Sequence, residues 1–128
     1  HSGVYPEHLD DPLARHHVPL VITGGAVNRE PAVIGTTGDQ TAIASTLLSA
    51  LGTDDSAFAF SHDLFDPSAS DYAFFSEPGM AAFVTPTDTV AINLDTDTPV
   101  IYSGPASDAA ADKCKAILQI IYDTLSEL

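Results

Sequence analysis

Hydrophobic positions change their spacing along the chain, and each spacing predicts a different element. Residues 18–23 form an almost unbroken apolar run that ends at Gly24, a pattern typical of a strand covered on both faces. Over 40–51 the apolar positions recur at helical spacing, with Asp39 placed to cap the first turn and Gly52 placed for a left-handed C-cap. The apolar face of this predicted helix consists of Ile43, Ala44, Leu47, Leu48 and Leu51. A covered strand followed by a one-faced helix is the repeating unit of an α/β layer.

Residues 72–103 change from helical to alternating spacing, which predicts an antiparallel meander. Turn-forming residues divide it into four strands, at 72–76, 81–85, 89–94 and 100–102. In the third strand, Val90, Ile92 and Leu94 alternate with Ala91, Asn93 and Asp95. This alternation predicts a sheet with one dry face and one wet face.

A long amphipathic helix is predicted over 108–126, with Ser107 as its N-cap. Its apolar stripe consists of Cys114, Ile117, Leu118, Ile121, Tyr122 and Leu125. The stripe lasts less than three heptads, which is short for a coiled coil, so we expect it to lie on the dry face of the meander. The predicted fold class is therefore α/β, more narrowly α+β, in which an apolar strand and helix precede an antiparallel β-meander packed on a C-terminal helix.

The remaining segments have no sustained period. The chain begins with an arm rich in Pro, Asp and His, in which we expect loop with a helical turn near 12–15. At 128 residues the whole chain fits a single domain, which buries about two thirds of its unfolded surface. We expect its parts to be an arm at 1–16, a strand, link and helix at 17–52, a connection at 53–71, strands at 72–103 and a helix at 107–126.

Charge and composition limit the kinds of partner that we expect for this chain. Eighteen acidic and four basic residues give a formal net charge of −14, which repels phosphate backbones, so nucleic acid is not expected as a partner. No apolar run approaches the roughly 20 residues needed to cross a bilayer, and we expect the chain itself to be soluble. The lone Cys114 cannot form an internal disulfide, and its place on an apolar stripe predicts a buried core thiol.

Several short motifs resemble a known enzyme family. In chain order they are His17-Val18-Pro19-Leu20, a double glycine, Gln40, Thr46-Leu47-Leu48 and a Leu-Gly pair. They look like the C-terminal part of sulfatases of the lipoteichoic acid synthase type, in the alkaline phosphatase superfamily. The family's following segments are similar to Phe60-Ser61, Leu64-Phe65 and Tyr72-Ala73-Phe74-Phe75, so that the resemblance covers most of residues 12–126. One departure is Ala42, where relatives usually carry an acidic residue.

The resemblance implies a C-terminal fragment of a longer, metal-dependent enzyme that acts on sulfate or phosphate esters. Because the family's nucleophile and most of its metal ligands lie upstream, it implies no catalytic, cofactor-binding or metal-binding residue in this fragment and a divalent metal in the parent. It also implies the upstream catalytic portion as a partner, and a parent that is exported or membrane-anchored with this part outside the cytoplasm. The chain begins without a signal peptide, which fits either a cytoplasmic protein or a piece of a longer one, and the resemblance favours the piece.

Three histidines are the candidates for a position near the parent's active centre: His1, His16 and His17. Histidine is a common metal ligand, but the arm has neither an HExxH motif nor a cysteine pair. The resemblance adds that His1 is what remains of the family's Asp-His-Gly metal motif.

Two further polar groups are interpreted as structural. Asp88, Asn93, Asp95 and Asp97 lack the glycine and the terminal glutamate of a calcium loop, so ordinary acidic turns are expected there. His62-Asp63 is not expected to be a catalytic pair, because adjacent side chains rarely face each other and no nucleophile elbow accompanies them.

Two functions remain open at this point. The first is the C-terminal subdomain of a metal-dependent sulfatase or phosphoglycerol transferase, inactive on its own and serving as scaffold. The alternative is a non-catalytic acidic binding or interaction module. In the first case we also expect the isolated fragment to form a homo-oligomer, because surfaces that the upstream portion covers in the parent are then exposed.

Overall fold

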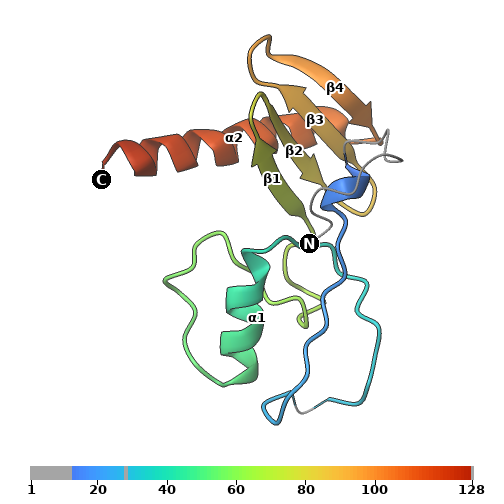
Figure 1. The fold of residues 1–128 in the computed structure, drawn as a ribbon, viewed down its shortest axis with the longest axis vertical. Coiled ribbons are helices and arrows are strands. Elements are labelled where there is room, and N and C mark those ends of the chain that lie inside the picture. Colours follow the sequence, from blue (N-terminus) through green and yellow to red (C-terminus); the bar gives the residue numbers. More distant parts are fainter. Residues whose placement is uncertain (1–12, 28, 128) are drawn as a thin grey trace. The chain divides into compact units, whose positions relative to one another are not determined.

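The computed structural model describes residues 13–27 and 29–127 (Figure 1). Its contacts divide the chain into two compact units, His1–Glu30 and Pro31–Leu128. The described part of the first unit contains one 3-10 turn, η1 (Ala14–His16), close to the helical turn expected in the arm. None of the described helices is both long enough and apolar enough to cross a bilayer.

Residues 18–23 do not form the predicted strand. They run without regular secondary structure between η1 and a turn at Gly24, and Val21 is 81% exposed. A strand exists only where a neighbouring strand takes its backbone hydrogen bonds, and none of the described strands pairs with this run. The prediction was wrong because an apolar sequence supplies the side chains of a covered strand but not the neighbour that completes it.

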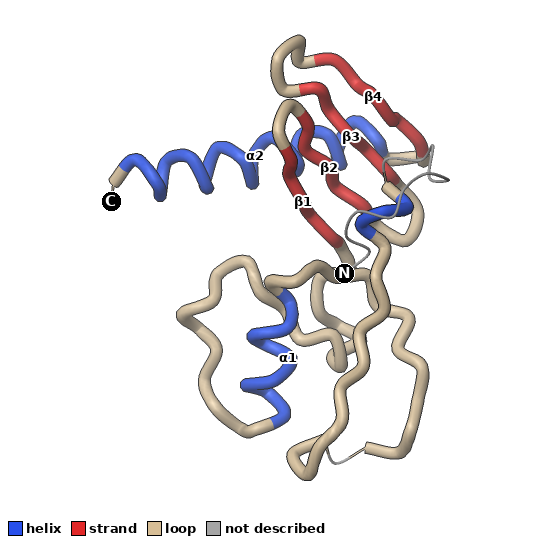
Figure 2. Tube along the Cα trace, viewed as in Figure 1, coloured by secondary structure: helices blue, strands red, loops and turns tan. Residues whose placement is uncertain are grey.

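Four strands form one antiparallel meander in the order β1-β2-β3-β4 (Figure 2). They are β1 (Ala73–Glu77), β2 (Met80–Val84), β3 (Thr89–Asn93) and β4 (Thr98–Ser103). The register places Phe74 opposite Phe83, and Phe83 opposite Val90 in turn. The predicted meander is confirmed, with strand ends within two residues of those expected.

Helix α2 (Ser107–Ser126) lies across one face of the sheet, where it contacts β2 and β3 (Figure 1). The core between them consists of Ala81, Phe83, Val90, Ile92, Ala110 and Cys114. Every one of these side chains is at most 4% exposed, so the first half of α2 and the middle strands share a complete apolar core. The predicted packing of the C-terminal helix on the meander is confirmed, and with it the α+β class.

The start of α2 differs from the prediction. Ala106 rather than Ser107 is the N-cap, and it makes no side-chain cap. Instead, Asp88 in the β2–β3 turn accepts the Ala106 backbone N–H on Oδ1 at 2.6 Å. Gly104 has a φ of 110°, and a Cβ at that position would overlap Asp88, so this close approach requires glycine. A carboxylate from a distant turn thus anchors the residue at which α2 begins.

The alternation predicted that the second face of the sheet is exposed to water, but this face is also largely buried. Met80, Ala82 and Ala91 alternate with the core residues and are nevertheless at most 8% exposed, whereas Leu94 is 36% exposed. The prediction failed because an alanine side chain is too small to mark a face as wet or dry.

Helix α1 (Ala42–Ala50) is the predicted helix, shorter by one or two residues at each end. Gly52 follows it with a φ of 66°. The Gly52 N–H donates to the Ser49 carbonyl at 3.0 Å, and the Thr53 N–H donates to the Leu48 carbonyl at 2.9 Å. These two bonds form a Schellman motif, so the predicted glycine C-cap is confirmed.

Candidate functional site

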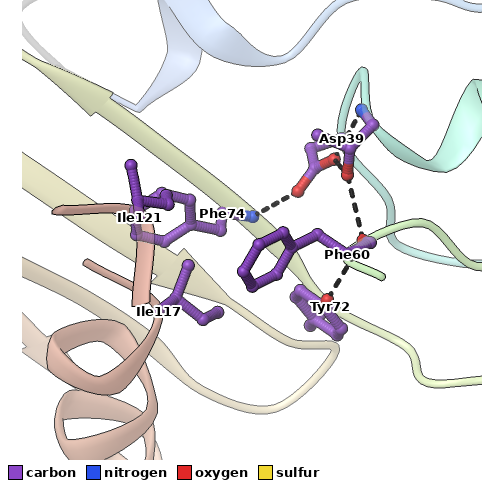
Figure 3. Close-up of a pocket in the computed structure, with 7 residues that line it drawn as sticks. Asp39, Phe60, Tyr72, Phe74, Ile117 and Ile121 are labelled. Atoms are coloured by element: carbon purple, nitrogen blue, oxygen red, sulfur yellow. Dashed lines mark hydrogen bonds between the residues drawn. The ribbon is translucent and has the colours of Figure 1, made fainter. Parts of the chain in front are cut away.

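A small hollow lies where α2 passes the edge strand β1 (Figure 3). It is lined by Asp39, Thr41, Phe60, Tyr72, Phe74, Ile117 and Ile121. Its volume is about 70 Å³. Pockets for small molecules usually measure about 300–1,000 Å³, so this hollow is too small for a substrate or cofactor. Its mostly apolar lining suits a single apolar side chain.

Asp39 closes one side of the hollow and joins α1 to β1. Its Oδ1 accepts the Thr41 backbone N–H at 2.8 Å and the Thr41 hydroxyl at 2.5 Å. Its Oδ2 accepts the Phe74 N–H at 2.9 Å, on the open edge of β1 (Figure 3). The Asp39 carboxylate therefore accepts a backbone N–H at the start of the helix, as predicted, but it lies two residues before Thr41, which is the N-cap. It also covers part of the edge strand β1.

The face of α1 that packs inward is small and polar. Its buried residues are Ala42, Ser45 and Thr46. The Thr46 hydroxyl donates to the carbonyl four residues earlier at 2.7 Å and accepts the Leu64 N–H at 2.9 Å. The Ser61 hydroxyl accepts the Ser45 N–H at 2.8 Å. These bonds attach α1 to the loop that follows it through polar groups, which the sequence did not indicate.

The predicted buried face of α1 is accordingly wrong. Leu47 is 42% exposed and Leu51 is 63% exposed, while Leu48 is only partly buried. The physical reason is that the loop at 60–65 offers backbone N–H and hydroxyl groups, so the helix turns its hydroxyl-bearing side toward that loop. Periodicity identified the leucine stripe but not the surface that faces it.

His62 is buried beside this polar layer, and the residue is 8% exposed. Its Nε2 lies 3.4 Å from the Thr37 carbonyl oxygen, and its Nδ1 has no hydrogen-bond partner within the described structure. The imidazole lies 5.0 Å from the ring of Tyr72, which in turn stacks on Phe83 at 5.2 Å. Burial, and then the negative charge of Asp39, raise the pKa of the Tyr72 phenol above its ordinary value of 10.0. His62 therefore packs against the Tyr72–Phe83 stack as a buried structural residue.

The neighbouring Asp63 is engaged in its own turn. Its Oδ1 accepts the Phe65 N–H at 2.8 Å, which is the geometry of an Asx-turn. His62 meanwhile contacts Tyr72, so the structure gives the two adjacent residues separate partners.

The histidines considered for a metal centre are not gathered into one. His16 ends η1, His17 follows it with an exposed side chain, and His1 lies outside the described residues. Among residues 13–27 and 29–127, no group of three or more His, Cys, Asp or Glu side chains could hold a metal ion. His16 and His17 therefore belong to no set of divalent-metal ligands among the described residues.

The polar residues of the meander belong to two different turns. Asp88 lies between β2 and β3, whereas Asn93, Asp95 and Asp97 lie around the turn between β3 and β4. The Asn93 Oδ1 accepts the Asp95 N–H at 2.9 Å, and Asp97 forms an ion pair with Lys115 of α2 at 2.7 Å. Consecutive turns of a meander lie at opposite ends of its strands, so these four residues do not converge on one ion.

Cys114 is fully buried in the core, as predicted. Burial raises the pKa of its thiol from 9.0 to about 11, and the neighbouring Lys115 offsets this only in part. A thiol with this pKa is protonated at neutral pH and is a poor nucleophile.

The hollow itself is not visible in the sequence. Phe60 was expected in a connection and Phe74 in a strand, and their positions along the chain do not show that both rings meet Ile117 and Ile121. The available signal was the length of the α2 stripe, which exceeds what a four-stranded sheet can cover.

Comparisons with protein-family models, curated proteins and solved structures found no match to this chain. The relation to sulfatases therefore stays a prediction that rests on the short motifs of the sequence.

Proposed function

We propose that this chain is the C-terminal, non-catalytic portion of a metal-dependent sulfatase or phosphoglycerol transferase. In this proposal the upstream portion supplies the nucleophile and the divalent metal, and the complete enzyme acts on sulfate or phosphate esters. The chain serves as scaffold and docking surface for that portion. The parent is exported or membrane-anchored, with this part outside the cytoplasm.

The observation that carries the proposal is the exposed leucine face of α1. Leu47 and Leu51 are 42% and 63% exposed, although they belong to a regular amphipathic stripe. Residues 18–23 likewise keep Val21 81% exposed in an apolar run that has no strand partner among the described residues. An apolar helix face and an apolar run of this kind are the parts of an α/β layer that still needs its remaining strands. The order of the sequence motifs supports the same interpretation.

The alternative is a self-contained acidic interaction module, and one observation favours it. The sheet and α2 already share a core in which Cys114 and Val90 are fully buried, so the Pro31–Leu128 unit has an apolar core of its own. A net charge of −14 then suits the recognition of a basic partner.

Reconstitution separates the two functions. The upstream coding segment is expressed with this chain, in one polypeptide and in trans, and metal-dependent hydrolysis of aryl sulfate and aryl phosphate esters is measured. We expect turnover only when both portions are present, because nucleophile and metal shell act as a unit. An upstream sequence without a Thr, Ser or Cys nucleophile motif, or turnover by this chain alone after removal of host phosphatases, would refute the proposal.

A matched pair of variants tests whether the leucine face is the contact. Leu47→Asp places a charge on that face, while Ser49→Asp places the same charge on another exposed position of α1. We expect Leu47→Asp to weaken the complex in trans and Ser49→Asp to leave it intact. Equal effects of the two variants would show that the leucine face does not contact the upstream portion.

A further inference from the structure

Helix α2 is longer than the sheet that supports it. Its 20 residues span about 30 Å, whereas four strands spaced about 4.8 Å apart measure about 15 Å across. Figure 1 shows the C-terminal half of α2 continuing past β1. Exposure rises along the apolar stripe, from 0% at Cys114 through partial burial at Ile121 to 61% at Leu125. The C-terminal half of α2 therefore presents an apolar surface beyond the core that α2 shares with the sheet.

The hollow is the inner end of this surface. Ile117 and Ile121 form one wall, and the rings of Phe60 and Phe74 point toward them from the other side (Figure 3). Leu125 follows Ile121 by about one helical turn. An occupant must place one apolar side chain in a space of about 70 Å³ and further apolar groups along the helix at turn spacing. An amphipathic helix has this spacing.

The charges around this surface determine which charge the polar face of the docked helix should carry. Residues 116–127 contain two acids, Asp123 and Glu127, and no basic residue. The preceding Lys115 forms an ion pair with Asp97 at 2.7 Å. A second copy of this chain would bring a further −14 charge, so at this surface the charges favour a cationic partner over the homo-oligomer expected from the sequence.

We infer that the surface formed by the hollow, Ile117, Ile121 and Leu125 docks an amphipathic helix with a basic polar face, and that one apolar side chain of this helix fills the hollow. The inference rests on the proposed function for the source of the helix, which is the upstream portion of the parent. The site itself depends only on this chain.

Two synthetic helices test the site directly. Both carry the same leucine spacing, and one has lysines on its polar face while the other has glutamates. They are titrated into the full chain with labelled Ile and Leu methyl groups, and NMR shifts are followed. We expect only the lysine helix to bind and to shift the methyl signals of Ile117, Ile121 and Leu125. Its binding should weaken when NaCl rises from about 50 mM to about 500 mM. Equal binding of both helices would overturn the inference.

Leu125→Asp and Val100→Asp form the matched pair of variants, because the wild-type residues are 61% and 53% exposed, on α2 and β4. We expect Leu125→Asp to weaken binding about tenfold or more and Val100→Asp to leave it unchanged, with circular dichroism confirming that both variants fold. Loss with Val100→Asp alone would overturn the α2 site while leaving the proposed function intact. Concentration-dependent shifts of the same three residues without any peptide would show that a second copy occupies the surface, and would also overturn the inference.

Discussion

Two carboxylates, Asp39 and Asp88, each join elements that lie far apart in the sequence. Asp39 connects the start of α1 to β1 through the N–H of Phe74, 35 residues away. Asp88 connects the β2–β3 turn to the start of α2 through the N–H of Ala106, 18 residues away. Hydrogen bonds to a charged acceptor are stronger than neutral ones, so single acids can hold these joints. In a chain with 18 acidic residues, these two have structural roles that composition does not reveal.

Asp88 gives a pH dependence with a definite sign. The Thr87 hydroxyl at 2.6 Å and then the Ala106 N–H hold the pKa of the Asp88 carboxyl below its ordinary value of 3.8. A lowered pKa in the folded state contributes stability at pH values above 3.8, and this contribution is lost as the pH falls through the folded-state value. We expect the urea midpoint of the wild type to fall between about pH 4.5 and about pH 2 more steeply than that of Asp88→Asn. Asp112→Asn, an exposed acid on α2, is the control and should follow the wild type; an Asp88→Asn profile parallel to the wild type would contradict the role.

At the scale of elements, α1 reverses the usual arrangement of an amphipathic helix. Its threonine and serine side is buried against the loop at 60–65, and its leucine side is exposed. In α2 the apolar stripe is buried over its first half, where β2 and β3 lie beneath it, and is exposed over its second half. The two helices therefore leave apolar surface for different reasons, one because of its rotation and the other because of its length.

The rotation of α1 predicts an unusual order of mutational costs. Thr46→Val keeps the side-chain shape but leaves the Leu64 N–H without its acceptor at 2.9 Å, which should cost about 1–3 kcal/mol of unfolding free energy. Leu47→Ala removes a side chain that is already 42% exposed and should cost less than about 1 kcal/mol. Urea denaturation of both variants measures the two free energies. A larger cost for Leu47→Ala would mean that the leucine face is the buried one.

The elements themselves were largely predictable from the sequence, because their signals are local. The alternation over 72–103 and the stripe over 108–126 gave the sheet and α2, and Gly52 marked the end of α1 correctly. What could not be predicted depends on neighbours. Residues 18–23 lack a partner strand within the described chain, and the orientation of α1 depends on hydroxyl groups such as that of Ser61 in a loop.

The candidate site was less predictable than the fold. Its lining comes from four segments of the sequence, and no local pattern shows that Phe60, Phe74 and Ile121 meet. Periodicity reports which side of an element is apolar, whereas a hollow depends on where one element stops short of another. Among the described residues, His16 and His17 join no group of three or more possible metal ligands, while His1 lies outside them.

At the scale of the whole molecule, the two units differ in how much secondary structure they contain. Among the described residues, His1–Glu30 holds only η1, while Pro31–Leu128 holds both α-helices and the sheet. Regions with few backbone hydrogen bonds in regular structure open at low free energy, and proteases cleave them first. The difference between the units should therefore appear in limited proteolysis.

Trypsin is well suited to this test, because the chain has only four basic residues: Arg15, Arg29, Lys113 and Lys115. All four have exposed side chains, so accessibility of the side chain alone does not distinguish them. Arg15 and Arg29 precede bonds in the first unit, whereas Lys113 and Lys115 lie within α2, where cleavage requires the helix to leave the sheet and unwind. We expect brief digestion, followed by mass spectrometry, to yield a stable product that begins at Glu30 and retains α2. Cleavage after Lys113 or Lys115 at the same rate as after Arg29 would mean that the core around Cys114 does not hold the helix on the sheet.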